Sequence, residues 1–221
     1  MSEPVHDGPG RLQAPVKVKI CGITTPGDAV AAIEAGADAL GFNGFRGSKR
    51  WIDLHRASEW IAQLPPLVTR VAVLVNPTLE EAEAVLALPG IDLLQFHGDE
   101  TPDLCDRFAE KGYLRAFAAR DRAVCQEIAR YRTRCVLLDA FVPGAYGGTG
   151  QLINLELAAE VVRDHRGRFV FLSGGLQPEN VAEAVAAVRP YAVDVASGVE
   201  SAPGRKDRER MRAFIAAAKG A

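Results

Sequence analysis

The sequence predicts an α/β fold in which parallel strands alternate with helices. Short apolar and β-branched runs alternate along the chain with segments whose apolar residues recur at helical spacing. Several runs are apolar at nearly every position, which is typical of strands that are covered on both faces. Eight strand and helix pairs in 221 residues fit the compact limit of a single closed (β/α)8 TIM barrel. An open, doubly wound sheet has the same local pattern, and periodicity alone does not separate the two.

The first strand is predicted at residues 16–20, and it ends in a thiol. Three apolar residues alternate with two lysines, and Gly22 then interrupts the pattern. Cys21 therefore lies where a strand passes into a loop. In parallel α/β folds this end of the sheet holds the functional site, although a buried structural cysteine is the ordinary alternative.

The later elements are predicted from capping signals and from periodicity. Thr25 and Pro26 are a typical N-cap and first helical residue, Asp53 is a second cap, and Thr78 with Glu81 has the spacing of a capping box. Seven further strands are expected at 38–42, 68–75, 91–96, 113–118, 135–139, 169–172 and 191–195. Helices are expected at 26–35, 53–64, 102–110 and 154–164. Further helices are expected to begin at Thr78 and at Asp121, and one helix should follow each of the last two strands.

Composition limits the functions that the chain can have. A formal charge of -2, from 26 basic and 28 acidic residues, gives no electrostatic reason to expect nucleic acid or an anionic membrane as a partner. The longest apolar runs fall well short of the length that spans a bilayer. The four cysteines lack CxxC spacing, which predicts reduced thiols and a cytoplasmic protein. The four histidines lack metal-ligand spacing, so no metal is expected.

The domain organisation is expected to be simple. Residues 1–15 are rich in proline and glycine and have no apolar core of a signal peptide, so they are predicted to form a flexible tail. The barrel and the catalytic site are then expected within residues 16–221.

Three glycine-rich turns follow late strands of the predicted barrel. They lie at residues 147–150, 173–176 and 196–199. The last two follow the seventh and eighth strands, the usual phosphate-binding position of such barrels, where backbone amides hold the anion. The alternative is that each is only a tight turn. The predicted phosphate-binding residues are Gly148, Thr149, Gly150, Gly174, Gly175, Ser197 and Gly198.

Asp139 ends an apolar strand, where an aspartate is costly unless it is solvated or partnered. Its position alone leaves a structural cap and a catalytic role both open. A barrel would put the ends of the first and sixth strands on opposite sides of one pocket mouth. Asp139 and Cys21 would then address two faces of a bound substrate as general acid and general base.

Residues 19–24 (KICGIT) resemble the opening motif of the phosphoribosylanthranilate isomerases. Further segments of that family's pattern follow in the family's order, so the resemblance spans about residues 16–218; they lie at 95–99, 137–139, 147–150, 172–176, 194–200 and 204–207. The resemblance implies a cofactor-free Amadori rearrangement in tryptophan biosynthesis. The substrate would be N-(5'-phosphoribosyl)anthranilate and the product 1-(2-carboxyphenylamino)-1-deoxyribulose 5-phosphate.

The resemblance also implies roles for individual residues. Asp139 matches the family's acid, which protonates the furanose oxygen, and Cys21 matches the base, which removes the proton from C2'. Arg50 matches an arginine whose fork would suit the anthranilate carboxylate. His97 and Asp194 match further substrate-binding positions. A phosphosugar is thus the expected partner, and the chain is expected to be a monomer or a homodimer.

The chain departs from the family's pattern at three places. Residues 45–47 read FRG where the family usually has an aromatic residue, proline and lysine. Gln151 follows the 147–150 turn where a lysine is common, and Ala196 replaces a usual serine. These changes leave the predicted acid, base and phosphate glycines in place, so they concern affinity more than the type of reaction.

Two rival interpretations remain at this point. One is another phosphosugar isomerase or epimerase on the same barrel, including the dual-specificity enzyme of histidine and tryptophan synthesis. That enzyme has an aspartate as its first-strand base, so Cys21 disfavours it, and Arg50 favours a substrate with a carboxylate. The other is a non-catalytic barrel that binds phosphosugars, which the presence of both Cys21 and Asp139 disfavours.

Overall fold

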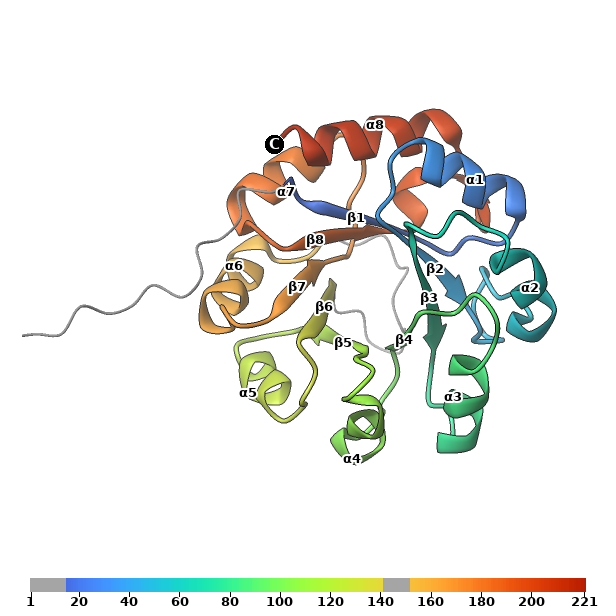
Figure 1. The fold of residues 1–221 in the computed structure, drawn as a ribbon. Helices are drawn as coiled ribbons and strands as arrows, with labels where there is room; N and C mark the ends of the chain where they lie inside the picture. Colours follow the sequence, from blue (N-terminus) through green and yellow to red (C-terminus); the bar gives the residue numbers. More distant parts are fainter. Residues whose placement is uncertain (1–14, 141–151) are drawn as a thin grey trace, which may run out of the picture.

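Eight parallel strands close into a barrel in chain order, and helices form a ring around them (Figure 1). The structure is a computed structural model that describes residues 15–140 and 152–221. The strands are β1 (Lys17–Cys21), β2 (Ala39–Asn43), β3 (Thr69–Leu74), β4 (Leu93–Phe96), β5 (Leu114–Ala119), β6 (Cys135–Ala140), β7 (Phe169–Leu172) and β8 (Ala192–Val195). Because β1 pairs with both β2 and β8, the sheet is closed, which confirms the barrel and excludes the open sheet.

The surrounding helices begin largely where the capping signals predict. Thr25 caps α1, Asp53 caps α2, and the Thr78 and Glu81 side chains form the capping box of α3. The helices are α1 (Pro26–Glu34), α2 (Leu54–Ile61), α3 (Leu79–Leu86), α4 (Pro102–Cys105), α5 (Ala123–Ala129), α6 (Leu155–Asp164), α7 (Val181–Val188) and α8 (Arg208–Lys219).

Three helix predictions were inexact. The helix expected at 53–64 ends at Ile61. The helix expected at 102–110 ends at Cys105 and continues only as the 3-10 turn η1 (Asp106–Phe108). Asp121 is not the N-cap of α5, because the helix begins one residue later, after Arg122. The Asp121 carboxylate still accepts a hydrogen bond from the Ala123 amide at 2.8 Å, so the side chain supports the turn that enters the helix.

A small antiparallel hairpin, which the sequence did not predict, lies between β8 and α8. It consists of β9 (Glu200–Ala202) and β10 (Arg205–Lys206), after the 3-10 turn η2 (Ser197–Val199). The hairpin is fastened to the loop after β1, since the Thr24 hydroxyl donates to the Gly204 carbonyl at 2.5 Å. The Lys206 amide also donates to the Asp28 carboxylate at 3.3 Å.

The two faces of β1 have opposite roles. Val18 and Ile20 are fully buried in the apolar layer between strands and helices. Lys17, Lys19 and Cys21 alternate with them and therefore point into the barrel. The lysines are thus on the inner face of a closed sheet, and one of them, Lys19, is completely buried.

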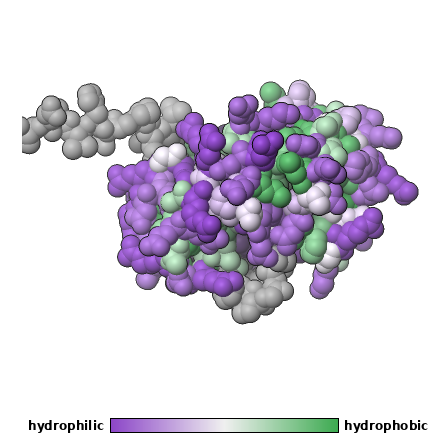
Figure 2. All heavy atoms as spheres, turned by 90° about the horizontal axis from the view of Figure 1, so that it is seen from below, coloured by the Kyte–Doolittle hydropathy of each residue, from purple (hydrophilic) through white to green (hydrophobic). Residues whose placement is uncertain are grey.

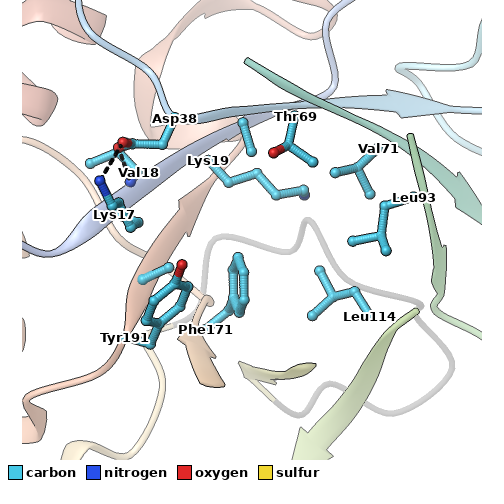
Figure 3. Close-up of a pocket in the computed structure, with 12 residues that line it drawn as sticks. Lys17, Val18, Lys19, Asp38, Thr69, Val71, Leu93, Leu114, Phe171 and Tyr191 are labelled. Carbon is cyan, nitrogen blue, oxygen red and sulfur yellow. Dashed lines mark hydrogen bonds and ion pairs between the residues drawn. The ribbon is translucent and has the colours of Figure 1, made fainter. Parts of the chain in front are cut away.

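The N-terminal end of the barrel encloses a cavity of about 250 Å³. Figure 3 shows Phe171, Leu93 and Leu114 around it, with the Lys17–Asp38 pair at its edge. The Lys19 side chain extends into the barrel away from that pair (Figure 3). This cavity lies at the opposite end of the strands from Cys21 and Asp139, at the face of such barrels that serves stability.

The outer surface is mixed in character. On the face that Figure 2 shows, hydrophilic side chains predominate and hydrophobic atoms form smaller areas among them. Within residues 15–140 and 152–221, none of the helices combines the length and the apolar character needed to cross a bilayer.

Candidate active site

The predicted base, Cys21, is the last residue of β1 and lies beside a residue without a side chain. Its register partner on β2 is Gly41, and a Cβ built on Gly41 would lie 2.8 Å from Cys21 Sγ. The same Cβ would lie 3.0 Å from Lys19 Nζ. Because Gly41 has no side chain, the Cys21 thiol and the Lys19 ammonium group can both lie next to its backbone.

The pKa of Cys21 is raised, chiefly because burial disfavours the thiolate. The Lys19 ammonium opposes this effect and lowers the pKa, while the Asp194 carboxylate adds to the rise. The environment of Cys21 therefore favours the thiol over the thiolate on balance. The physical reason is that removal from water outweighs the neighbouring positive charge.

The predicted acid, Asp139, lies near the end of β6 with a fractional exposure of 7%. Its Oδ1 accepts from the Ala140 amide at 2.9 Å, and its Oδ2 lies 3.3 Å from His97 Nε2. His97 Nδ1 lies 2.8 Å from the Gln95 side-chain nitrogen, so with that amide donating, the ring proton is on Nε2 and faces Asp139. Among the described residues, the ring thus contacts the predicted acid and the Gln95 side chain, and no backbone group.

The loop that carries His97 is held by a buried ion pair. Arg115 Nη1 lies 3.4 Å from the Glu100 carboxylate, and Arg115 Nη2 donates to the Gly98 carbonyl at 3.0 Å. Glu100 in turn accepts from the Gly98 amide at 2.9 Å. Because both the amide and the carbonyl of Gly98 are bound, the chain after β4 has a fixed path, which fixes His97 against Asp139.

Arg50 lies beside the loop that follows Cys21, but part of its guanidinium is already engaged. Nε and Nη2 donate to the two oxygens of Glu200 at 2.7 and 2.8 Å, and this contact raises the pKa of Arg50. The stem packs on Gly22, where an added Cβ would lie 2.4 Å from Arg50 Cδ. Glu200 also accepts from Lys206 Nζ at 2.9 Å. Within residues 15–140 and 152–221, no contact engages the edge formed by Nη1 and the second hydrogen of Nη2, and this edge could receive a carboxylate end-on.

The predicted phosphate turns after β7 and β8 lie against each other. Gly174 and Gly175 have φ of +92° and +65°, which favour glycine. A Cβ on Gly198 would lie 2.0 Å from the Leu176 carbonyl oxygen, so only glycine fits this contact. Among the described residues, none accepts a hydrogen bond from the Gly175 or Gly198 amides. Gly148, Thr149 and Gly150 lie outside the described residues.

Asp194 is committed to contacts inside the barrel. Its Oδ1 accepts from Lys19 Nζ at 2.6 Å, and its Oδ2 accepts from the Ser173 hydroxyl at 3.2 Å. The ion pair is buried, and breaking such a pair by removing one partner typically costs about 3–5 kcal/mol. The structure therefore gives Asp194 a partner that the sequence did not suggest, in Lys19.

The predicted residues are distributed around one rim of the barrel. Going round the closed sheet, the order is β1 with Cys21, β8 and β7 with the two glycine turns, and β6 with Asp139. A phosphate bound at the turns would therefore lie between the predicted base and the predicted acid. Within the described residues, no cluster of three or more histidine, cysteine or acidic side chains has an arrangement that would hold a metal ion.

Sequence reasoning missed three charged residues of this region as site residues, namely Lys19, Glu200 and Lys206. Lys19 shares its strand face with Cys21, and this periodicity was the available signal. It shows which residues share a face, but not that the face is the inside of a closed barrel. The pairing of Arg50 with Glu200, 150 residues away, had no local signal.

The fold and the rim together define the chain as a (β/α)8 barrel whose polar groups gather at the C-terminal ends of its strands. The family model described as "N-(5'phosphoribosyl)anthranilate (PRA) isomerase" matches residues 18–217. The chain therefore belongs to the N-(5'-phosphoribosyl)anthranilate isomerase family.

Individual relatives agree with this assignment. The chain is 51% identical over 206 residues to the N-(5'-phosphoribosyl)anthranilate isomerase of Trichlorobacter lovleyi, covering 93% of this chain and 99% of that protein. A crystal structure of phosphoribosyl anthranilate isomerase from Thermotoga maritima has a TM-score of 0.84 and 39% identity, covering 93% of this chain and all of that one. A crystal structure of the same kind of enzyme in complex with reduced 1-(o-carboxyphenylamino)-1-deoxyribulose 5-phosphate has a TM-score of 0.80 and 38% identity, covering 93% of this chain and all of that one.

Proposed function

We propose that the chain catalyses the Amadori rearrangement of N-(5'-phosphoribosyl)anthranilate to 1-(2-carboxyphenylamino)-1-deoxyribulose 5-phosphate, a step of tryptophan biosynthesis. The observation that carries this proposal is the placement of Cys21 and Asp139 on β1 and β6, with two glycine turns between them around the rim. A base, an acid and an anion cradle on one rim are what the rearrangement requires.

The reaction begins with ring opening. Asp139 gives its proton to the furanose oxygen as the C1'–O bond breaks, and the anilino nitrogen lone pair forms the Schiff base. The carboxylate that results keeps its hydrogen bonds from the Ala140 amide and His97 Nε2.

The second step moves a hydrogen from C2'. The Cys21 thiolate takes this proton, and the C–H electron pair forms the C1'=C2' bond of an enolamine while the nitrogen becomes neutral. In the last step C1' takes the proton from the Cys21 thiol, and the C2' hydroxyl gives its proton to the Asp139 carboxylate as its oxygen forms the ketone. The thiolate and the acid are both restored. The net change transfers hydrogen from C2' to C1', so the step needs neither an oxidant nor a cofactor.

The proposal is tested by mixing the purified protein with N-(5'-phosphoribosyl)anthranilate and following the loss of substrate fluorescence. Conversion is the expected result. A protein that binds the substrate without consuming it would instead be a non-catalytic phosphosugar barrel, and this outcome would contradict the proposal.

Arg50 is proposed to hold the ring carboxylate through the Nη1 and Nη2 edge that Glu200 leaves open. We expect Arg50→Ala to raise KM for the natural substrate about tenfold or more, because a charge-assisted contact is lost while the phosphate contacts remain. The comparison needs a ligand without the carboxylate, whose affinity should hardly change. Equal losses for both ligands would mean that Arg50 only shapes the loop after β2.

Gly198→Ala is expected to weaken phosphate binding, because its new Cβ meets the Leu176 carbonyl and pushes the two turns apart. Inhibition of turnover by inorganic phosphate should become weaker, and KM for the substrate should rise by about tenfold or more. Gly27→Ala is the matched control, since nothing lies within 4 Å of the Cβ it adds. If both variants kept the parental phosphate inhibition, the turn after β8 would not be part of the anion site.

The remaining proposals concern organisation. We propose one catalytic domain at residues 16–221. The predicted tail at residues 1–15 lies, except for Pro15, outside the described residues. A cytoplasmic location is also proposed, which four free cysteines support. His97 and Asp194 are proposed to support binding from their positions beside Asp139 and Lys19. A relative from Thermotoga maritima is described as a dimeric phosphoribosylanthranilate isomerase, and this chain is proposed to be a monomer or a homodimer, which light scattering would distinguish.

A further inference from the structure

The closed barrel places a cation directly beneath the predicted base. Lys19 and Cys21 are two residues apart on β1, so both side chains point inward. Lys19 is in register with Asp194 on β8, and Cys21 is in register with Gly41 on β2. The ammonium group thus has a carboxylate on one side and an empty glycine position on the other.

The position of Lys19 Nζ is narrowly defined. It donates to Asp194 Oδ1 at 2.6 Å, and a Cβ on Gly41 would come within 3.0 Å of it and within 2.8 Å of Cys21 Sγ. The thiol and the ammonium group therefore occupy the space that a larger residue at position 41 would fill. Lys19 is fully buried, so solvent does not screen its charge from the sulfur.

We propose that Lys19 is a positioning residue for Cys21. The ammonium group of Lys19 stabilises the Cys21 thiolate, and Asp194, itself bound by Ser173, holds that ammonium group in place. The proposal rests on the proposed function, because it assigns Lys19 a task in the reaction only if Cys21 is the base. When Cys21 accepts the proton from C2', its charge is neutralised, and the Lys19–Asp194 pair remains as a balanced ion pair.

The other charged groups that act on Cys21 are engaged differently. Lys206 and Arg50 both contact Glu200, whose carboxylate offsets much of their combined positive charge. Lys206 Nζ also donates to the Ala196 carbonyl. Lys19 is the cation that does most to lower the pKa of Cys21, and Asp194 is the anion that raises it.

The ionisation of the two groups agrees with this geometry. Burial alone would lower the pKa of Lys19, but Asp194 and Cys21 outweigh it and the pKa is raised, so Lys19 stays charged. The pKa of Cys21 is raised by burial and lowered by Lys19. Loss of the lysine charge should therefore move the thiol pKa further upward.

The test compares Lys19→Met with Lys17→Met, which removes the other inward-facing lysine of β1. Lys17 is paired with Asp38 at the opposite end of the barrel and is half exposed, so its loss should leave Cys21 unchanged. The measurement is the rate of Cys21 alkylation by iodoacetamide across pH, followed by peptide mapping. For Lys19→Met we expect the alkylation profile to move up by about one pH unit or more, the scale of a close opposite charge.

Asp194 supplies the opposite arm of the same experiment. Asp194→Asn should move the alkylation profile to lower pH, because it removes the anion and leaves Lys19 to the sulfur. A merely structural role would not produce opposite shifts from the two partners. The double variant Lys19→Met, Asp194→Asn leaves no unpaired buried charge, so it carries the test if Lys19→Met alone does not fold, and we expect it to keep an upward shift.

The pH dependence of kcat/KM completes the test. Its acidic limb should follow the alkylation profile in each variant, since the base must be ionised. Matching alkylation profiles for Lys19→Met, Lys17→Met and the parental protein would overturn the proposal for Lys19. Absence of turnover in the parental protein would overturn the proposed function instead, while the alkylation rates would still report on Lys19.

Discussion

Asp139→Asn is expected to lower turnover by about a hundredfold or more, the scale of a positioned general acid. The amide has the shape of the carboxyl group but does not protonate the furanose oxygen. Affinity for a reduced product analogue should stay nearly unchanged, because the glycine turns after β7 and β8 are untouched. Steady-state kinetics and calorimetric titration of the analogue measure the two quantities separately.

The matched control for Asp139→Asn is Asp92→Asn. Asp92 is a partly exposed aspartate that pairs with Arg70 at 2.8 Å, just before β4, at the far end of the barrel. Its replacement should leave turnover close to parental. If Asp139→Asn behaved in the same way, Asp139 would be a structural residue and the acid would have to be another group.

Cys21→Ala is expected to reduce turnover by about a hundredfold or more, because the proton on C2' loses its acceptor. Limited alkylation of the parental protein should also show that turnover depends on Cys21. Activity should be lost in proportion to the fraction of Cys21 that is modified. A saturating product analogue should slow both events. Full activity in Cys21→Ala would remove this thiol from the mechanism.

The other three cysteines provide controls for the alkylation. Cys125 on α5 is partly exposed, with its Sγ 3.7 Å from the Asp164 carboxylate, so its modification is the one to distinguish from that of Cys21. Cys125→Ala should leave turnover unchanged. Cys105 is fully buried and its pKa is raised to about 12, mainly by burial, so it should not react near neutral pH. Cys135, at the start of β6, also has a raised pKa because it is buried.

Most of the fold could be predicted because its signals are local. Apolar runs marked the eight strands, and the Thr25, Asp53 and Thr78 caps marked helix starts within a few residues of the groups they bind. The early end of α4 and the β9–β10 hairpin were missed. The hairpin depends on contacts with the loop after β1 and the first turn of α1, about 180 residues earlier, which no local pattern encodes.

The candidate site was predictable in its residues and less so in its electrostatics. Motif order pointed to Cys21 and Asp139, and the strand ends that carry them lie on one rim. The rise in the pKa of Cys21 was not predictable from the sequence. It results from burial and Asp194, which raise the pKa, and Lys19, which lowers it. The Glu200 contact of Arg50 likewise required the hairpin to be in place.

The pairing of β1 with β8, which closes the barrel, has a consequence for synthesis of the chain. Lys19 is among the first residues that the ribosome makes in this fold, and its carboxylate partner is 175 residues later. Before β8 has emerged from the ribosome, Lys19 lies beside the predicted base without its partner Asp194. At that stage Arg50 also lacks its partner Glu200. The emerging polypeptide therefore acquires a complete rim only when its last segment docks, so catalytic competence should arrive late and all at once during translation.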